Sequence, residues 1–245
     1  MELEQPTKFF RLGELRKRML SECSLCHHTG IVEGKACRCF KTFERYVQYS
    51  YAGVDEEYWP LEFKDFESDQ VARELAETYS LNLANARKFG LGFVFSGRNG
   101  TGKTMLCCVI LKKALKEGHT IYFITFADLL DIIKKSFDNE YYKALFEKIR
   151  SVDFLCLDEL GAEYRPKDLE SFCVAQLSQL SRSRRRNHLC TLVTTNLEKP
   201  EFETVYGKTI NSLFSGCSKF VSVKGEDWRR QQNISWEKNL LGKSE

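Results

Sequence analysis

The feature that most constrains this chain is a glycine-rich loop between a predicted strand and a predicted helix. Residues 97–104 read Gly-Arg-Asn-Gly-Thr-Gly-Lys-Thr, which is a glycine, four residues and then Gly-Lys-Thr. The apolar run 91–96 predicts a buried strand before the loop, and 105–116 predicts a helix after it, ended by Gly118. This order is typical of a loop that binds nucleotide phosphates, and less so of a simple connecting turn.

Each part of the loop has a predicted role. The glycines let successive backbone N–H groups turn toward a triphosphate, and the helix N-terminus adds partial positive charge. The lysine supplies a cation to the phosphates, and the last threonine supplies a hydroxyl to Mg²⁺. The predicted nucleotide-binding residues are Gly97, Asn99, Gly100, Thr101, Gly102, Lys103 and Thr104.

Polar residues follow two further apolar runs. The run that begins at Val152 ends in Asp158 and Glu159, and the run 190–195 ends in Asn196. Because parallel sheets bind ligands at the carboxyl ends of their strands, these side chains are expected beside the phosphate loop. We predict that Asp158 holds Mg²⁺ together with Thr104 and that Glu159 orients the water that attacks the γ-phosphate. Asn196 either hydrogen-bonds the γ-phosphate or that water, or is only a polar strand end.

The remaining pattern predicts a parallel α/β sheet, because apolar runs alternate with helical spacing. A further strand is expected at 120–126, with helices at 127–136 and 141–150. Ahead of the loop, helices are expected at 9–20, 40–51 and 71–88, with a linker around 53–66. We divide the chain into an N-terminal domain (1–55), a linker (56–68) and a nucleotide-binding domain (69–245).

Four of the ten cysteines are bunched near the N-terminus. Cys23 and Cys26 form one pair, Cys37 and Cys39 form another, and the residues between them predict a small hairpin. Two pairs of this kind can hold one structural Zn²⁺, whose binding would supply the folding energy that so short a segment lacks. His27 or His28 replacing a sulfur, and reduced thiols without metal, are the alternatives. The other cysteines, such as Cys107 and Cys156, lie in apolar runs and are predicted to be core residues.

Composition favours a cytoplasmic protein. A formal net charge of +3 permits contact with nucleic acid without requiring it. No apolar run approaches the roughly 20 residues that span a bilayer, so no membrane partner is expected. Residues 1–5 are acidic and lack the layout of a secretory signal. The 245 residues are also too few for the two motor cores of a non-hexameric helicase.

Taken together, the motifs resemble the DnaC/DnaI group of AAA+ ATPases, the bacterial and phage replicative helicase loaders. Cys-Ser-Leu-Cys-His-His-Thr-Gly at 23–30 and Cys-Arg-Cys at 37–39 resemble the zinc-binding front end of DnaI-like members. The other matching segments are the loop at 97–104, Asp-Glu-Leu-Gly at 158–161, Thr-Thr-Asn-Leu at 194–197, Tyr-Gly at 206–207 and Gly-Glu-Asp-Trp-Arg at 225–229.

This resemblance implies an AAA+ P-loop fold with a five-stranded parallel sheet, the last strand lying near 219–223 and the zinc-bearing domain in front. Asn196 matches the sensor-1 position of the family. Arg229 matches the sensor-2 position, where a guanidinium contacts the γ-phosphate. The front end is expected to grip a hexameric DnaB-type helicase. The ATPase domain is expected to bind ATP, Mg²⁺ and single-stranded DNA, and to form homo-oligomers, and hydrolysis is expected to time release of the helicase.

One departure from the family pattern affects catalysis. Members carry Tyr-Gly-Glu-Arg and then Ser-Arg-Leu, whose second arginine reaches a neighbouring subunit's nucleotide. Here both arginines are absent and Leu213 stands at the finger position. Since such a finger is worth roughly three to five powers of ten in rate, we predict slow hydrolysis by the isolated protein. Lys208, or the arginines at 182 and 184–186, could compensate; a solvated or DNA-facing patch is the other interpretation of those arginines.

Two other functions stay open. An IstB-like transposition helper shares the AAA+ core and assembles on duplex DNA. An adaptor that occupies a helicase without loading it would explain the missing arginines.

Overall fold

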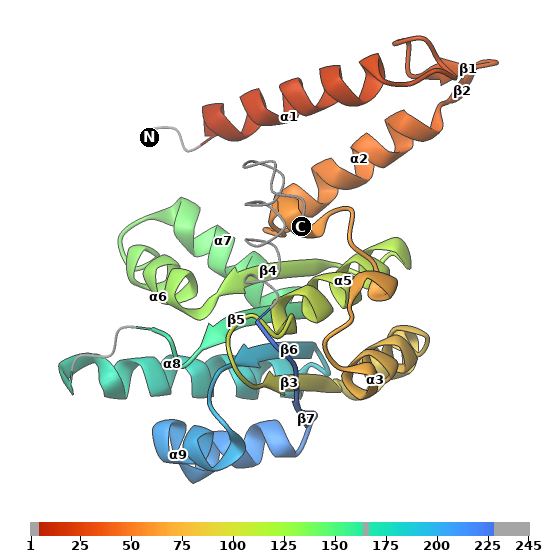
Figure 1. Ribbon diagram of the computed structural model, residues 1–245. Coiled ribbons are helices and arrows are strands. Elements are labelled where there is room, and N and C mark those ends of the chain that lie inside the picture. The colour runs from red at the N-terminus through yellow and green to blue at the C-terminus, as the bar shows by residue number, and fades with distance from the viewer. Residues whose placement is uncertain (1–4, 164–166, 228–245) are drawn as a thin grey trace, which may run out of the picture. The chain divides into compact units, whose positions relative to one another are not determined.

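The computed structural model describes residues 5–163 and 167–227, and it separates into two compact units, Met1–Trp59 and Pro60–Glu245 (Figure 1). The boundary falls after Trp59. The functional assignment of the ranges 1–55, 56–68 and 69–245 stays a prediction.

The first unit is built from two helices and a hairpin. Helix α1 (Gln5–Ser21) contacts α2 (Arg38–Tyr51), and between them β1 (Ile31–Val32) pairs antiparallel with β2 (Lys35–Ala36). The hairpin expected from the turn residues is therefore present. The 3₁₀ turn η1 (Glu56–Tyr58) precedes Trp59, whose indole N–H donates a 2.8 Å hydrogen bond to the carbonyl of Val54. This hydrogen bond fixes the buried indole ring at the end of the unit.

The second unit contains the parallel sheet. Its strands are β3 (Gly92–Ser96), β4 (Ile121–Thr125), β5 (Phe154–Leu160), β6 (Cys190–Thr195) and β7 (Ser218–Ser222), in the order β4-β5-β6-β3-β7. All four pairings are parallel, which confirms the predicted five-stranded α/β fold. The side chains of β3 and β6 are buried along their whole length, as expected for strands covered on both faces.

Helices cover both faces of this sheet (Figure 1). On one face, α5 (Lys103–Lys116) packs on β4, β5 and β6 and contacts α3 (Gln70–Ser80). The other face carries α6 (Phe126–Lys135), α8 (Lys167–Arg186) and α9 (Lys199–Ser215), with α7 (Glu140–Ser151) packed on α6 and α8. A large core lies under this second layer, with Phe126, Leu157, Leu177 and Phe202 completely buried.

The single helix expected at 71–88 is wrong. The structure has α3, which ends at Ser80, and a separate α4 (Leu83–Phe89). The break falls at Asn82, whose side-chain amide donates to the carbonyl of Thr78 at 2.8 Å. An asparagine that hydrogen-bonds the preceding turn competes with helix continuation. The segment before α3 is also ordered in part, since Phe63–Asp65 forms the 3₁₀ turn η2.

Candidate functional site

The glycine-rich loop joins β3 to α5, as the sequence predicts. Gly97, Gly100 and Gly102 have φ values of 135°, 74° and 83°, which residues with a side chain rarely adopt. A Cβ on Gly97 would also lie 2.4 Å from the carbonyl oxygen of Val223. Gly102 caps α5 in the left-handed conformation, so the first N–H groups of that helix face the loop. The loop therefore has the backbone of an anion-binding cradle.

Lys103 is buried, and its ammonium lies within this loop. Its Nζ donates to the carbonyls of Gly97 and Arg98 at 2.8 and 2.7 Å, and to Oδ1 of Asn196 at 3.0 Å. Two predicted site residues that are far apart in sequence are thus in direct contact. These three acceptors are neutral, so an anionic phosphate oxygen can compete for the same ammonium protons with a stronger, charge-assisted hydrogen bond.

Asp158 lies across from the start of α5 at the carboxyl end of β5. Its Oδ1 accepts hydrogen bonds from the hydroxyls of Thr104 at 3.0 Å and Thr194 at 2.6 Å. Burial raises the pKa of this carboxyl, and the two hydroxyls oppose the shift by lowering it. A buried carboxylate with a hydroxyl 3.0 Å away is a suitable oxygen ligand pair for Mg²⁺. No motif in the sequence assigns Thr194 a role of its own, and the signal for one is a polar residue late in an otherwise apolar strand.

Glu159 is exposed and has strained backbone geometry. Its φ is 55°, in the left-handed region, and the β5–β6 register shifts between Leu157 and Leu160. The N–H of Glu159 donates to Thr194 Oγ1 at 3.0 Å. A bulge of this kind redirects a side chain out of the strand, and positive φ in a glutamate is held only where neighbouring contacts fix it. The buried Asp158 and the exposed Glu159 therefore have different environments, as their different predicted roles require.

The loop after β5 is tied to α9 through a buried carboxylate. Glu163 accepts from the N–H of Gly161 at 2.7 Å and from the hydroxyl of Tyr206 at 2.6 Å. Both Glu163 and Tyr206 are buried. Glu163 was not singled out from the sequence, and no local motif distinguishes it. Its contacts fix the backbone immediately after Glu159.

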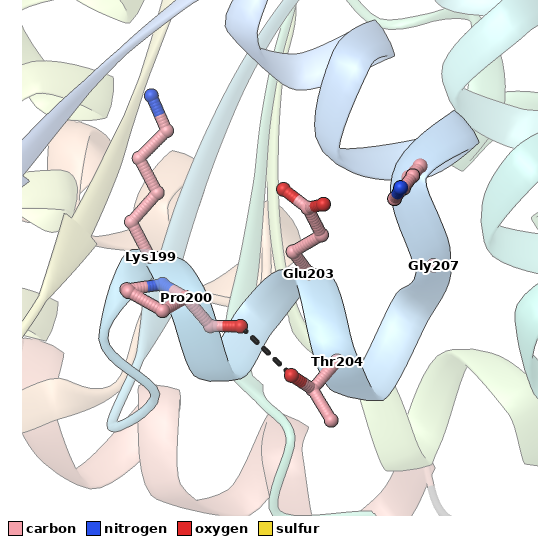
Figure 2. Close-up of a pocket in the computed structure, with 6 residues that line it drawn as sticks. Lys199, Pro200, Glu203, Thr204 and Gly207 are labelled. Atoms are coloured by element: carbon pink, nitrogen blue, oxygen red, sulfur yellow. Dashed lines mark hydrogen bonds between the residues drawn. The ribbon is translucent and has the colours of Figure 1, made fainter.

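Two cavities lie near these elements. One, of about 270 Å³, is lined by Gly97, Arg98, Thr101 and residues around Val223. The other, of about 610 Å³, follows α9 from Lys199 to the kink at Gly207 (Figure 2). Although the groove on α9 is larger, the loop has the chemistry that phosphate binding requires. Only the loop has inward-facing amides, a buried lysine and a carboxylate beside it.

The other predicted nucleotide-site residues differ in placement. The Thr101 side chain is buried, and its hydroxyl donates to the carbonyl of Arg98 at 3.0 Å. Asn99 is exposed at the tip of the loop. The predicted sensor-2 residue, Arg229, lies outside the described residues.

The four N-terminal cysteines converge in the first unit. The sulfur atoms of Cys23, Cys26, Cys37 and Cys39 all lie within 4.8 Å of one another. The Cys23–Cys37 and Cys26–Cys39 sulfur pairs are 3.8 and 3.5 Å apart. Tetrahedral zinc with Zn–S bonds of about 2.3 Å separates its sulfurs by about 3.8 Å, so the geometry fits this metal. Neither neighbouring histidine belongs to the cluster.

The interpretation of Arg184 as part of a solvated, DNA-facing or finger-bearing run is wrong. Its side chain is 1% exposed. The guanidinium donates to Thr191 Oγ1 and to the carbonyls of Arg150, Val152 and Cys190, at 2.6–3.0 Å. Because these acceptors surround the starts of β5 and β6, the arginine joins two strands from inside the protein. The arginines at 182, 185 and 186 are exposed.

Comparison with known proteins identifies the family. The model of the IstB-like ATP binding protein family matches residues 24–235. The chain belongs to this family. The matched range includes the phosphate loop, the acidic end of β5 and residues 24–59 of the first unit. Within the described residues, none of the helices of this IstB-like chain has the length and apolar character needed to cross a bilayer.

Relatives of this IstB-like chain include proteins named as replicative helicase loaders. The replicative helicase loader DnaC of Escherichia coli strain K12 is 29% identical over 161 residues, which cover 64% of this chain and 61% of that protein. A crystal structure of the DnaC helicase loader superposes with a TM-score of 0.60 at 24% identity, covering 69% of this chain and 100% of that one. A DnaI structure has a TM-score of 0.59 at 18% identity, covering 71% and 94%. These matches confirm the resemblance to the DnaC/DnaI group.

Proposed function

We propose that this protein is an ATP-dependent loader that places a hexameric DnaB-type replicative helicase on single-stranded DNA. The observation that carries the proposal is the convergence of Lys103, Thr104, Asp158 and Asn196 at the carboxyl edge of the sheet, in a member of an ATP-binding family. The DnaC relative supplies the helicase-loading part of the proposal.

Within this proposal, the loop amides and Lys103 bind the β- and γ-phosphates of ATP. Thr104 and Asp158 hold Mg²⁺, which neutralises charge on the phosphates. Glu159 orients the attacking water, and Asn196, now bonded to Lys103, turns to the γ-phosphate or that water. Arg229 contacts the γ-phosphate. The first unit, with Zn²⁺ on its four cysteines, binds the helicase, and several copies assemble on DNA.

Nucleotide turnover tests the enzymatic part. Glu159→Gln should retain ATP binding, because the phosphate cradle is intact. It should lose turnover by about 10²–10⁴-fold, the range for removing a general base. Isothermal calorimetry and phosphate release measure the two properties separately. If this variant turned over ATP as fast as the parent protein, another residue would have to orient the attacking water.

Helicase binding tests the partner. The full chain mixed with a DnaB-type hexamer should co-elute from size exclusion, and a fragment of residues 60–245 should not, although it should still bind ADP. The ADP measurement is the control that the fragment has folded. Absence of co-elution by the full chain, with and without ATP, would reject the loader function.

A second candidate function is that of a transposition helper, which the IstB-like family model favours. Fluorescence anisotropy with single-stranded and duplex oligonucleotides of equal length separates the two. The loader is expected to prefer the single strand, and a preference for duplex DNA in the presence of ATP would favour the helper. An adaptor without hydrolysis is the expected conclusion if helicase binds but no condition produces turnover.

A further inference from the structure

The absence of an arginine at position 213 leaves the proposed ATPase without the cation that a neighbouring subunit would provide. We infer that Arg185 supplies this cation, reaching the nucleotide of a second copy of the chain. The inference rests on the proposed ATP hydrolysis. It concerns one exposed residue on α8, and four observations carry it.

The first observation is the position of the Arg185 guanidinium at the end of α9. Arg185 lies in the last turn of α8, and its guanidinium packs against Gly216, which ends α9. The two terminal nitrogens are 3.2 and 3.3 Å from the point where a Cβ would stand on Gly216. Cys217 links this place to position 213, because its Sγ lies 3.2 Å from the carbonyl oxygen of Leu213 and donates to it. The guanidinium thus lies at the end of α9, against a residue three positions after Leu213.

The second observation is the effect of Arg185 on the pKa of Cys217, which also places the arginine beside the end of α9. Burial raises the pKa of the Cys217 thiol, and the positive charge of Arg185 opposes that shift. The arginine is therefore close enough to act on the residue that follows α9. A positive charge also interacts favourably with the last carbonyls of a helix, so the position is stable before any partner arrives.

The third observation is that the Arg185 side chain is accessible to a partner. Arg185 is exposed, whereas the adjacent Arg184 is buried and committed to backbone carbonyls. No carboxylate in the described part of the chain forms an ion pair with Arg185. A guanidinium stays charged at all relevant pH values and presents planar pairs of N–H donors to phosphate oxygens. Arg185 therefore has the charge and the hydrogen-bond donors of an arginine finger.

The fourth observation is that Arg185 and the phosphate loop of the same chain lie at opposite ends of the parallel strands. Helices α8 and α9 end where β6 and β7 begin, at Cys190 and Ser218, whereas the phosphate loop follows the end of β3. Because these strands are parallel, Arg185 and its own loop lie at opposite edges of the sheet. Five residues at 3.3 Å each separate the edges by about 16 Å. Arg185 therefore acts only on the nucleotide of another subunit.

Lys208 is the competing cation, and its setting is less suitable. It lines the groove on α9 and directly follows the kink at Gly207. Its compact, strongly hydrated ammonium cannot form the paired hydrogen bonds of a guanidinium. Removing each cation in turn separates the two.

A mixed-subunit assay tests the inference with full-length chains and oligo(dT). Arg185→Ala should bind ATP like the parent and lose turnover by about 100-fold or more, toward the range of arginine fingers. Arg186→Ala and Lys208→Ala remove other exposed charges and should stay within about twofold of the parent. Lys103→Ala chains, which cannot hold phosphates, retain Arg185. Mixing them with Arg185→Ala chains should raise turnover about tenfold or more above either protein alone, because each intact site then meets a neighbour's arginine.

Each outcome is decisive. A purely structural role for Arg185 cannot produce recovery on mixing, so recovery supports the inference. Turnover by Arg185→Ala close to that of the parent, or no gain on mixing, overturns it while leaving the ATPase function standing. A parent protein that hydrolyses no ATP would reject the ATPase function and the finger with it.

Discussion

At the scale of single residues, two buried charges show how the same burial serves different purposes. Arg184 is surrounded by acceptors, and although burial lowers its pKa to about 9 the guanidinium stays charged at neutral pH. Asp158 has only two hydroxyl donors among the described side chains, and burial raises its pKa. The arginine is satisfied within the protein, whereas the aspartate has Lys103 as a nearby positive charge and would gain a direct counter-charge from a bound cation.

Arg184→Met should lower the free energy of unfolding by about 2–4 kcal/mol, because several buried carbonyls lose their donors. Urea unfolding at pH 7 measures this. Arg186→Met, at an exposed position two residues along the same helix, is the control and should change stability by no more than about 0.5 kcal/mol. Equal effects of the two substitutions would contradict the structural role of Arg184.

Asp158→Asn should raise the melting temperature of the nucleotide-free protein at pH 7. A raised pKa means that the folded state favours the protonated carboxyl. Its stabilising contribution is therefore present below the unfolded pKa of about 3.9 and is lost as pH rises through the folded value. Asparagine can keep the hydroxyl contacts without the charge. The same variant should lose the Mg²⁺-dependent part of the stabilisation by ATP, and thermal scans with and without Mg²⁺ check both effects. A lower melting temperature of the variant without nucleotide would show that the charged Asp158 carboxylate does not destabilise the folded protein.

At the scale of elements, the important link runs from the end of β5 to α9. Glu163 holds the backbone N–H of Gly161 and the hydroxyl of Tyr206 at once. Residue 206 directly precedes the kink of α9 at Gly207, where φ is 81° and ψ is 161°. The helix that ends beside Arg185 is thus connected through Glu163 to the loop that directly follows β5, the strand that contains Glu159.

Tyr206→Phe and Glu163→Gln should each destabilise the protein, and the double variant should cost less than their sum. Because a hydrogen bond to a carboxylate contributes about 1.5–3 kcal/mol, a coupling energy of about 1 kcal/mol or more is expected. Unfolding free energies of the four proteins form the cycle, and phosphate release measures turnover in parallel. Strict additivity would show that the contact at 2.6 Å stabilises neither element through the other.

At the scale of the whole molecule, the chain combines two units stabilised by different means. The second unit has a continuous apolar core beneath α6, α8 and α9. Among its described side chains the first unit has few large buried ones, and it contains a cluster of four cysteines. A segment of that size is marginal without a staple, so its folding should depend on the metal.

Removal of zinc should therefore unfold the first unit and leave the second intact. The purified protein should contain about one Zn²⁺ per chain, as four thiolates close one tetrahedral site. After chelation, or in Cys26→Ser, residues 1–59 should become sensitive to limited proteolysis while ADP binding persists. Cys173→Ser, a buried cysteine of the other unit, is the control and should retain zinc. Parent-like protection of the first unit after chelation would argue against a metal staple.

The sequence alone determined the features that depend on local order. The phosphate loop between β3 and α5, the acids at the end of β5 and the pairs of cysteines were all readable, because strand, turn and metal-ligand chemistry need particular residues at short spacing. The parallel sheet followed from the alternation of apolar runs and helices.

Tertiary structure alone decided what each long side chain does. The arginines at 184 and 185 are indistinguishable in the sequence, yet one is enclosed by β5 and β6 and the other is exposed beside the end of α9. Glu163 and Thr194 gained their partners in the same way, from strands and helices distant along the chain. Burial and hydrogen-bond partners depend on which elements pack together, and that is a property of the assembled sheet and its helices.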